Sequence, residues 1–149
     1  MGQLRTSPPP PEAVDLERWV LDSPDGLRDL RASLRDALDR HGLVQGEDLD
    51  EVPHLVVLVA TELASNALRH GRPPTIVTLL GRDDCFLLDV ADHDVRTVPE
   101  LTDIHPLDSG GRGLFLAQQL SLAVGWYATA HTKNIWASFP RPARAAVDA

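Results

Sequence analysis

The most informative part of this chain is the stretch Thr61-Glu62-Leu63-Ala64-Ser65-Asn66-Ala67-Leu68-Arg69-His70-Gly71. At the helical period of about 100° per residue, the apolar side chains of this region fall on one continuous arc. Glu62, Asn66 and His70 fall on the other side, four residues apart, and side chains with that spacing are neighbours on a helix surface. The sequence therefore predicts a helix over residues 52–70 that buries one face and presents a carboxylate, an amide and an imidazole on the other.

The composition is that of an ordinary globular protein. The chain has 149 residues, of which 43% are hydrophobic and 24% charged, which suits one domain with a real core. Its net charge of -8 argues against a broad nucleic-acid interface, which needs clustered Lys and Arg, and permits a basic protein partner. No apolar stretch approaches the roughly 20 residues of a membrane-spanning helix, and no apolar secretory segment follows Arg5. We therefore expect a cytoplasmic protein that binds neither nucleic acid nor membrane directly.

Strand and helix patterns alternate along the chain. Ser23-Pro24-Asp25 has the features of a helix start, because Ser caps, Pro suits the first position and an acid suits the first turn. Hairpin-linked strands with helices gathered on one face predict an α+β two-layer sandwich. The expected elements are a strand at 14–21, helices at 24–41 and 52–70, strands at 75–80 and 85–92, a glycine-rich turn and helix at 110–122, and strands at 123–130 and 134–139.

The ends and one long connection differ from this pattern. Residues 1–13 include four consecutive prolines and are expected to form a disordered tail, residues 14–140 one domain, and residues 141–149 a C-terminal tail. Residues 93–108 lack a steady period, and a connection of that length is often a functional lid. Cys85 is the single cysteine and stands in an apolar strand, so we expect a core thiol in a reducing compartment.

Glu62 and Asn66 could carry phosphoryl-transfer chemistry. Magnesium prefers oxygen ligands and often takes only one or two from a protein at a nucleotide site, so the Asn66 side-chain oxygen would suffice. Glu62, one turn earlier, could accept a proton from a nucleophile that attacks a γ-phosphate. On the spacing alone, an exposed Glu and an Asn packed near the helix end is the preferred interpretation, because Glu and Asn four residues apart are common.

The glycine cluster is a candidate phosphate site. Gly110, Gly111 and Gly113 surround Arg112, and a helix pattern begins at Leu114. Free N–H groups at a helix N-terminus attract phosphate, and the Arg112 side chain could contact one. An ordinary loop capped by Asp108 or Ser109 remains the alternative.

Asp92 ends the apolar strand that begins at Cys85. A carboxylate at the mouth of an apolar pocket can accept the exocyclic amine of adenine, which guanine lacks. An Asp that starts a turn is the alternative interpretation.

The order of these three signals resembles the GHKL ATPase superfamily, which includes gyrase-type, chaperone, histidine-kinase and mismatch-repair ATPases. Asp92 stands where the aspartate of its G1 box is expected. The small size of the chain and the residue pattern around Glu62 are similar to those of the bacterial anti-sigma-factor serine kinases, especially the actinobacterial ones. This resemblance extends over residues 14–140. Three runs carry the likeness to the N box, the G2 box and the closing strand: Glu62-Leu63-Ala64-Ser65-Asn66-Ala67, Gly110-Gly111-Arg112-Gly113-Leu114 and Ile135-Trp136-Ala137-Ser138-Phe139-Pro140.

The resemblance implies a mixed, mostly antiparallel sheet faced by three helices, with ATP and Mg²⁺ between the second helix and a lid. It implies that Asn66 ligates Mg²⁺, Glu62 is the general base and Asp92 holds adenine, while residues 110–114 approach the phosphates. Members of this group typically bind a sigma factor and phosphorylate a serine or threonine of a small anti-anti-sigma (STAS-type) protein. A homodimer is also plausible.

The G1 region departs from the superfamily pattern Asp-x-Gly-x-Gly. It reads Asp92-His93-Asp94-Val95-Arg96, and because Gly permits backbone conformations that Asp and Arg adopt only at a cost, the floor of the pocket must be built differently. Two interpretations stay open: a serine/threonine kinase of the anti-sigma type, or a non-catalytic regulatory binder of the same fold. A histidine-kinase fragment is disfavoured, because the chain has no room for a dimerising helical hairpin.

Overall fold

A computed structural model of the chain describes residues 6–7, 12–41, 51–96 and 123–141. The predicted elements within these ranges are all present, with ends shifted by a few residues at most. No helix in these ranges is long and apolar enough to cross a membrane. The elements are β1 (Val14–Leu21), the short 3-10 turn η1 (Pro24–Gly26), α1 (Leu27–Arg40), α2 (Glu51–His70), β2 (Thr75–Gly81), β3 (Cys85–Asp92), β4 (Ala123–Ala128) and β5 (Lys133–Pro140).

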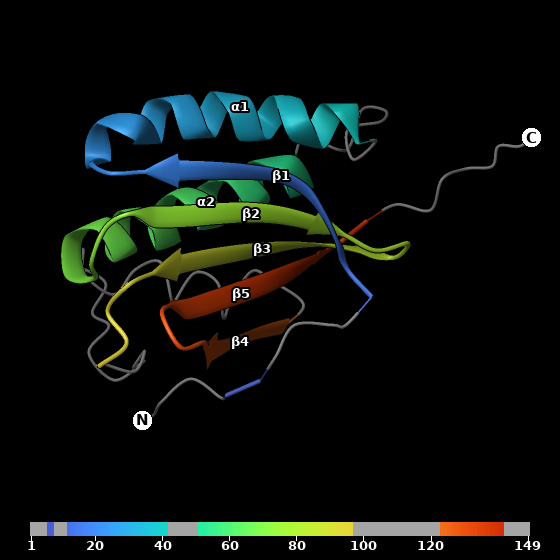
Figure 1. Cartoon of the computed structure of the whole chain (residues 1–149). Helices are drawn as coiled ribbons and strands as arrows, with labels where there is room; N and C mark the ends of the chain where they lie inside the picture. Colours follow the sequence, from blue (N-terminus) through green and yellow to red (C-terminus); the bar gives the residue numbers. More distant parts are fainter. Residues whose placement is uncertain (1–5, 8–11, 42–50, 97–122, 142–149) are drawn as a thin grey trace, which may run out of the picture.

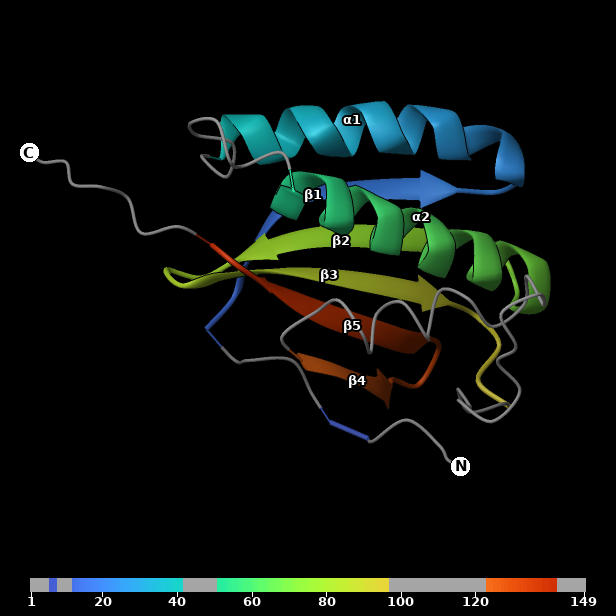
Figure 2. The same cartoon turned by 180° about the vertical axis from the view of Figure 1, so that it is seen from behind.

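The strands form one sheet in the order β1-β2-β3-β5-β4, and each neighbouring pair in it is antiparallel. Both α-helices lie on the same face of this sheet, α1 over its β1 edge and α2 over its middle (Figures 1 and 2). The predicted α+β two-layer sandwich is therefore confirmed. The third predicted helix, over residues 110–122, lies outside the described residues.

The helices form where their apolar periodicity meets the sheet. Ser23 caps the first turn, because its hydroxyl accepts a hydrogen bond from the Asp25 N–H at 3.3 Å. The apolar arc expected for α2 is the face that it buries. Together the helices and the sheet enclose one core, in which the fully buried side chains each contribute about 1.5–3 kcal/mol; its largest members are Phe86, Phe139, Leu30, Leu34, Leu38, Leu63, Leu79 and Leu88.

The central strand β3 is buried on both faces. Because successive side chains of a strand point to opposite faces, Leu88 and Val90 join the core beneath the helices. Cys85 and Leu87 pack instead with Trp136 on the other face. Burial raises the pKa of the Cys85 thiol, which agrees with the expected core thiol.

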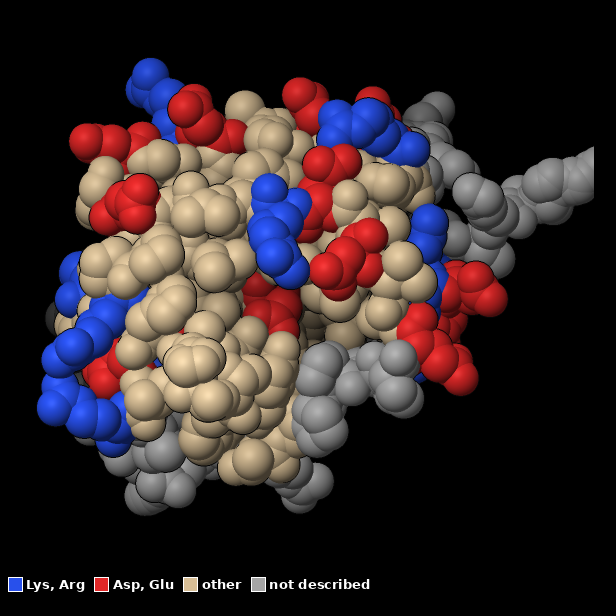
Figure 3. Space-filling view, viewed as in Figure 1, with Lys and Arg blue, Asp and Glu red and all other residues tan. Residues whose placement is uncertain are grey.

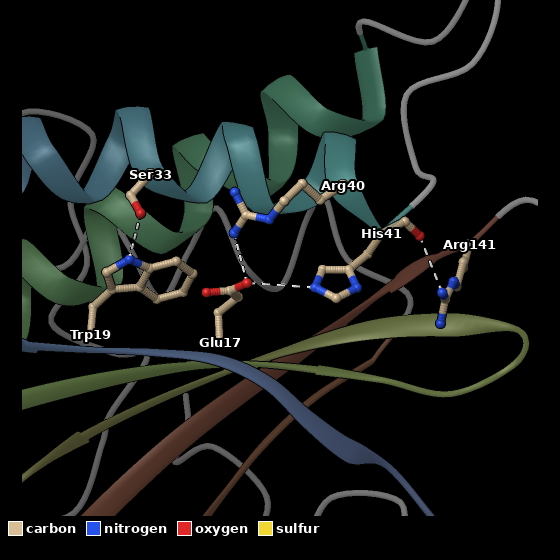
Figure 4. Close-up of polar contacts among 6 residues, drawn as sticks. All are labelled: Glu17, Trp19, Ser33, Arg40, His41 and Arg141. Carbon is tan, nitrogen blue, oxygen red and sulfur yellow. Dashed lines mark hydrogen bonds and ion pairs between the residues drawn. The ribbon is translucent and has the colours of Figure 1, made fainter.

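Polar contacts fasten α1 to the sheet (Figure 4). Trp19 Nε1 donates to Ser33 Oγ at 2.8 Å, and Arg40 donates to Glu17 at 2.7 Å. The Arg40 guanidinium holds the pKa of the Glu17 carboxyl below its usual value. Arg141 donates to the His41 carbonyl at 3.1 Å, so the chain beyond β5 also holds the end of α1.

The N-terminal segment contacts the open face of the sheet at its β4 edge. Thr6 forms a parallel bridge with Trp126, and the Ser7 N–H donates to the Trp126 carbonyl at 2.8 Å. Trp136 Nε1 donates to the Ser7 carbonyl at 2.7 Å. These two residues of the predicted tail are thus paired with the sheet, while residues 1–5 and 8–11 lie outside the described part.

Candidate functional site

The C-terminal half of α2 carries the two polar side chains that the sequence singles out. Glu62 and Asn66 lie one turn apart, and both are half-buried. The Asn66 Oδ1 atom is buried and has no hydrogen-bond partner among the residues that the structure describes. An unsatisfied buried acceptor costs about 1–3 kcal/mol, so this oxygen is a candidate to meet a ligand.

The end of α2 packs directly against the end of β3. A Cβ built at Gly71 would lie 2.4 Å from Cγ and 2.5 Å from Oδ2 of Asp92. Such distances are impossible for a real side chain, so glycine is needed here for the close approach of two elements. Gly71 thereby brings the helix with Glu62 and Asn66 to the end of the strand that carries Asp92.

Asp92 is a buried carboxylate, with 5% of its surface exposed. Its Oδ1 accepts the Asp94 N–H at 2.7 Å, and the Lys133 ammonium lies 3.8 Å from its Oδ2. Burial is the largest influence and raises the pKa of Asp92, although the hydrogen bond from Asp94 and the charge of Lys133 oppose the rise. Backbone N–H groups of Asp94 and of Arg72, which precedes β2, hold the carboxylate, and Lys133 places a cation beside it.

The loop after Asp92 is built without the two glycines of the family pattern. Asp94 Oδ1 accepts the Arg96 N–H at 3.1 Å, so two successive Asx turns, at Asp92 and Asp94, hold this backbone. The His93 N–H donates to the Arg72 carbonyl at 3.0 Å, and His93 Nδ1 donates to the Pro74 carbonyl at 3.0 Å. Among the described residues, none other than glycine has a positive φ. Hydrogen bonds from backbone N–H groups to the Asp92 and Asp94 side chains therefore hold residues 92–96 in a turn that does not need the conformations open only to glycine.

Thr75 brings a second unsatisfied oxygen to this end of the sheet. The register of β2 against β3 pairs Ile76 with Ala91, and its continuation places Thr75 opposite Asp92. Thr75 is fully buried, and within the described part of the chain its hydroxyl has no hydrogen-bond partner. Buried hydroxyls are normally paired, so Thr75 and Asn66 both suggest that this region meets a polar ligand.

Basic side chains gather at the same end of the molecule. Lys and Arg side chains line the end of the sheet where β2 begins and β3 ends, whereas acidic side chains gather at the opposite end, near the β2–β3 turn (Figures 1 and 3). The segments that meet at this end of the sheet carry four basic residues, Arg69, Arg72, Arg96 and Lys133. In a chain of net charge -8, such a local excess favours an anionic ligand.

Comparison with known proteins assigns the chain to a family. Residues 20–139 match the family model described as Histidine kinase-like ATPase domain. The chain belongs to this family. A comparison with curated proteins found no match. The histidine kinase-like ATPase domain is an ATP-binding domain that usually takes its nucleotide with Mg²⁺, and the match includes α1, α2 and most of the sheet.

The histidine kinase-like ATPase fold assembles part of the predicted site. It brings Asp92 to the end of α2, the helix that carries Glu62 and Asn66. The glycine cluster, Gly110, Gly111, Arg112, Gly113 and Leu114, lies outside the described residues. The roles of all these side chains therefore stay predictions.

Sequence reasoning missed Lys133, Thr75 and the packing role of Gly71. Lys133 could have been found by extending the final hairpin by one residue, because β5 begins at Lys133 rather than Asn134. The contact of Gly71 with Asp92 joins residues 21 positions apart and has no local signal.

A second buried carboxylate, Asp89, lies on the other face of β3. Tyr127 donates to its Oδ2 at 2.5 Å, and Asn134 Nδ2 donates to its Oδ1 at 2.7 Å. Thr132 donates in turn to Asn134 Oδ1 at 2.7 Å. Burial raises the pKa of Asp89, and burial together with the bond to Asp89 raises the pKa of Tyr127. This network joins β3, β4 and β5 on the face away from the helices.

Proposed function

We propose that this protein binds ATP and Mg²⁺ along α2 and phosphorylates a serine or threonine of a small anti-anti-sigma (STAS-type) protein, while regulating transcription by sequestering a sigma factor. One observation carries the nucleotide site: Asn66 has a buried oxygen to which no described residue forms a hydrogen bond, on the helix whose end packs against Asp92. Carboxamide oxygens are suitable Mg²⁺ ligands.

The geometry of α2 suggests how a nucleotide would lie. At a rise of about 1.5 Å per residue, Asn66 lies about 7.5 Å and Glu62 about 13.5 Å from Gly71 along the helix axis. A base at Asp92 would therefore direct its phosphates along the helix toward Asn66. The basic side chains at this end of the sheet would favour the phosphate charge.

Each side chain has a distinct task in this proposal. Bound Mg²⁺ would neutralise phosphate charge and orient the γ-phosphoryl group. Asn66 offers its oxygen to the metal, and Asp92 accepts a hydrogen bond from the adenine amine. Glu62 accepts the proton of the substrate hydroxyl as that oxygen forms its bond to phosphorus, with ADP as the leaving group.

Support for the partners comes from the motifs and not from contacts in the structure. The stretch around Glu62 and Asn66 resembles that of anti-sigma serine kinases, and the family match extends over nearly the whole predicted domain. A homodimer is part of the same expectation.

A non-catalytic regulatory binder of the same fold remains the second candidate. The observation that favours it is the G1 region, where Asp94 and Arg96 replace the two glycines and where the Asp92 carboxylate already faces Lys133. Such a protein would sequester its partner with weak ATP turnover or none.

An assay of phosphoryl transfer distinguishes the kinase from the non-catalytic binder. It uses labelled ATP, Mg²⁺ and a candidate anti-anti-sigma protein. The kinase proposal predicts label on the partner with wild type and its loss, by about 100-fold or more, in Glu62→Gln. Glu12→Gln is the matched control, because Glu12 is exposed and contacts Arg82 at 3.7 Å in the β2–β3 turn, at the other end of β3 from Asp92. Partner binding without transfer by wild type would favour the non-catalytic binder.

A further inference from the structure

One outer edge of the sheet is formed by β4, and the N-terminal segment pairs with it. The strand order ends in β5-β4, so only one side of β4 adjoins another strand of the sheet. Residues 6–7 lie along its other side in both views of the molecule (Figures 1 and 2). An edge strand presents a row of backbone N–H and C=O groups to which a further strand can pair, and residues 6–7 take that place.

Both backbone groups of Ser7 are bound at this edge. Its N–H donates to the Trp126 carbonyl at 2.8 Å, and its carbonyl accepts a hydrogen bond from Trp136 Nε1 at 2.7 Å. A Cβ at Gly125 would lie 3.1 Å from the Ser7 Cβ and 3.0 Å from Trp136 Nε1, so glycine leaves the space in which Ser7 reaches the indole. Since both hydrogen bonds use backbone groups of Ser7, a residue of another type could form them as well.

The segment of the chain itself pairs with β4 over a short length. Within the described residues the pairing is a single parallel bridge, between Thr6 and Trp126. Every second residue of an added strand faces its neighbour, so the donor after Ser7 would be Pro9, which has no N–H. By the same alternation, the backbone groups of Ala128 point to the outer side of β4, as those of Trp126 do. A proline-free segment could therefore extend the pairing to Ala128, which the chain's own sequence cannot.

We propose that the outer edge of β4, together with Trp136, is a strand-addition site for an extended, proline-free segment of a partner protein. In this mode of recognition, main-chain hydrogen bonds provide the affinity. The bound segment runs in the direction of residues 6–7, places a small residue beside Gly125 and continues to Ala128. Residues 6–7 are the resident occupant, which a longer segment replaces because it forms more hydrogen bonds with β4.

Calorimetry with a synthetic peptide tests the site in the full-length chain. The peptide has the sequence of residues 3–7 followed by Val-Thr-Val, so that no proline ends the pairing. Ser7→Pro removes the N–H that pairs with Trp126 and opens the edge. This variant should bind the peptide about tenfold or more tightly than wild type, in which the tethered segment competes. Methylation of the peptide's serine nitrogen removes the same donor, and should lower the affinity for Ser7→Pro about tenfold.

The indole donor is tested in the Ser7→Pro background. Adding Trp136→Phe should lower the affinity for the peptide about tenfold, because the donor to the serine carbonyl is lost. Trp19→Phe is the matched control, since the Trp19 indole donates to Ser33 of α1 on the helix-covered face. It removes one indole N–H from the protein and should leave the affinity for the peptide unchanged.

Three results would overturn the proposal. The first is a Ser7→Pro protein that binds no peptide, or that binds the methylated and unmethylated peptides equally; the comparison of peptides needs no further variant to fold. The second is a folded Trp136→Phe variant that keeps the full affinity. The third is a wild-type dimer that Ser7→Pro converts to a monomer in sedimentation velocity, which would assign the edge to the N-terminal segment of a second copy. None of these measurements depends on nucleotide binding.

Discussion

Asp89 and Asp92 lie three residues apart on β3 and face opposite sides of the sheet. Both are buried, and burial raises the pKa of each. The partners of the two carboxylates differ. Asp89 has each oxygen held by a neutral side chain of the sheet, Tyr127 on one and Asn134 on the other. Asp92 is held by the backbone N–H groups of Asp94 and Arg72 and faces a cation.

The difference shows how a structural carboxylate can be told from a binding one. Around Asp89 the sheet itself supplies complementary donors, and the network extends to Thr132. Around Asp92 the neighbouring elements carry two buried oxygens, on Asn66 and Thr75, that have no hydrogen-bond partner in residues 6–7, 12–41, 51–96 and 123–141. Burial and a raised pKa are common to both carboxylates. What distinguishes the proposed binding carboxylate from the structural one is its partners and the hydrogen-bonding state of the polar groups around it.

Exchanging each carboxylate for an amide should give the largest contrast in ligand binding. In Asp92→Asn the affinity for ATP should fall by about 10- to 100-fold, because a carboxylate acceptor facing the adenine amine is lost. Asp89→Asn should stay within about twofold of wild type, since its site is on the other face of the sheet. Calorimetric titration with Mg²⁺-ATP measures both; equal losses in the two variants would remove the distinction.

Truncating either side chain should lower the stability of the protein, for a different reason at each site. Asp89→Ala leaves the Tyr127 hydroxyl and the Asn134 amide without a buried acceptor, so the free energy of unfolding should fall by about 1–3 kcal/mol. Asp92→Ala leaves the mostly buried Lys133 ammonium without its carboxylate, so it should also destabilise the protein, and adding Lys133→Met should recover part of that loss. Urea unfolding provides the comparison, and Tyr127→Phe, at about 1 kcal/mol, should reproduce part of the Asp89 effect. An Asp89→Ala variant as stable as wild type would contradict this account.

Gly71→Ala tests whether the contact between α2 and β3 positions Asp92. The new Cβ would meet Asp92 Cγ at 2.4 Å and the Ala67 carbonyl at 2.8 Å, so Asp92 must move, at a cost of about 1–3 kcal/mol, and ATP affinity should fall with it. Gly26→Ala is the matched control, because its Cβ would meet only the Leu21 side chain, at 3.0 Å. Gly71→Ala with unchanged ATP affinity would show that the contact is merely structural.

The pH dependence should have opposite signs for stability and for binding. Since burial raises both pKa values above the usual value of about 3.9, the folded protein binds these protons more tightly than the unfolded chain. The resulting stability is fully present below the usual pKa and is lost as the pH rises through the raised one. ATP affinity should instead decrease as the pH falls through the raised pKa of Asp92, because the protonated acid is a poor acceptor.

Urea unfolding and calorimetry across this window measure the two trends. Asp89→Asn should flatten mainly the stability profile, and Asp92→Asn should flatten the affinity profile as well. An affinity that rises on acidification would conflict with an ionised Asp92 at the base site.

Local patterns were sufficient for most of the described fold. Asp92 was predicted to end β3 and does, because the apolar run from Cys85 is flanked by polar turns on both sides. The Ser23 cap was likewise visible in three consecutive residues. The end of α2 at His70 followed from Gly71 and the prolines after it.

The rest of the site depends on register between distant segments. Lys133 meets Asp92 only because β5 pairs with β3 in one particular alignment, and the same alignment brings Asn134 to Asp89, 45 positions away. A one-residue shift in that register would reverse which face each side chain occupies. No local pattern specifies that alignment, which is set by packing of the complete sheet.

The Mg²⁺ dependence of ATP binding, in wild type and in Asn66→Ala, tests most directly the claim that a nucleotide lies along α2 between Asp92 and the buried Asn66 oxygen. Calorimetry should show that Mg²⁺ strengthens ATP binding to wild type by about tenfold or more and that Asn66→Ala loses this gain while it keeps its fold. A wild-type protein that binds no ATP with Mg²⁺ present, or an Asn66→Ala variant that keeps the full gain, would contradict the claim.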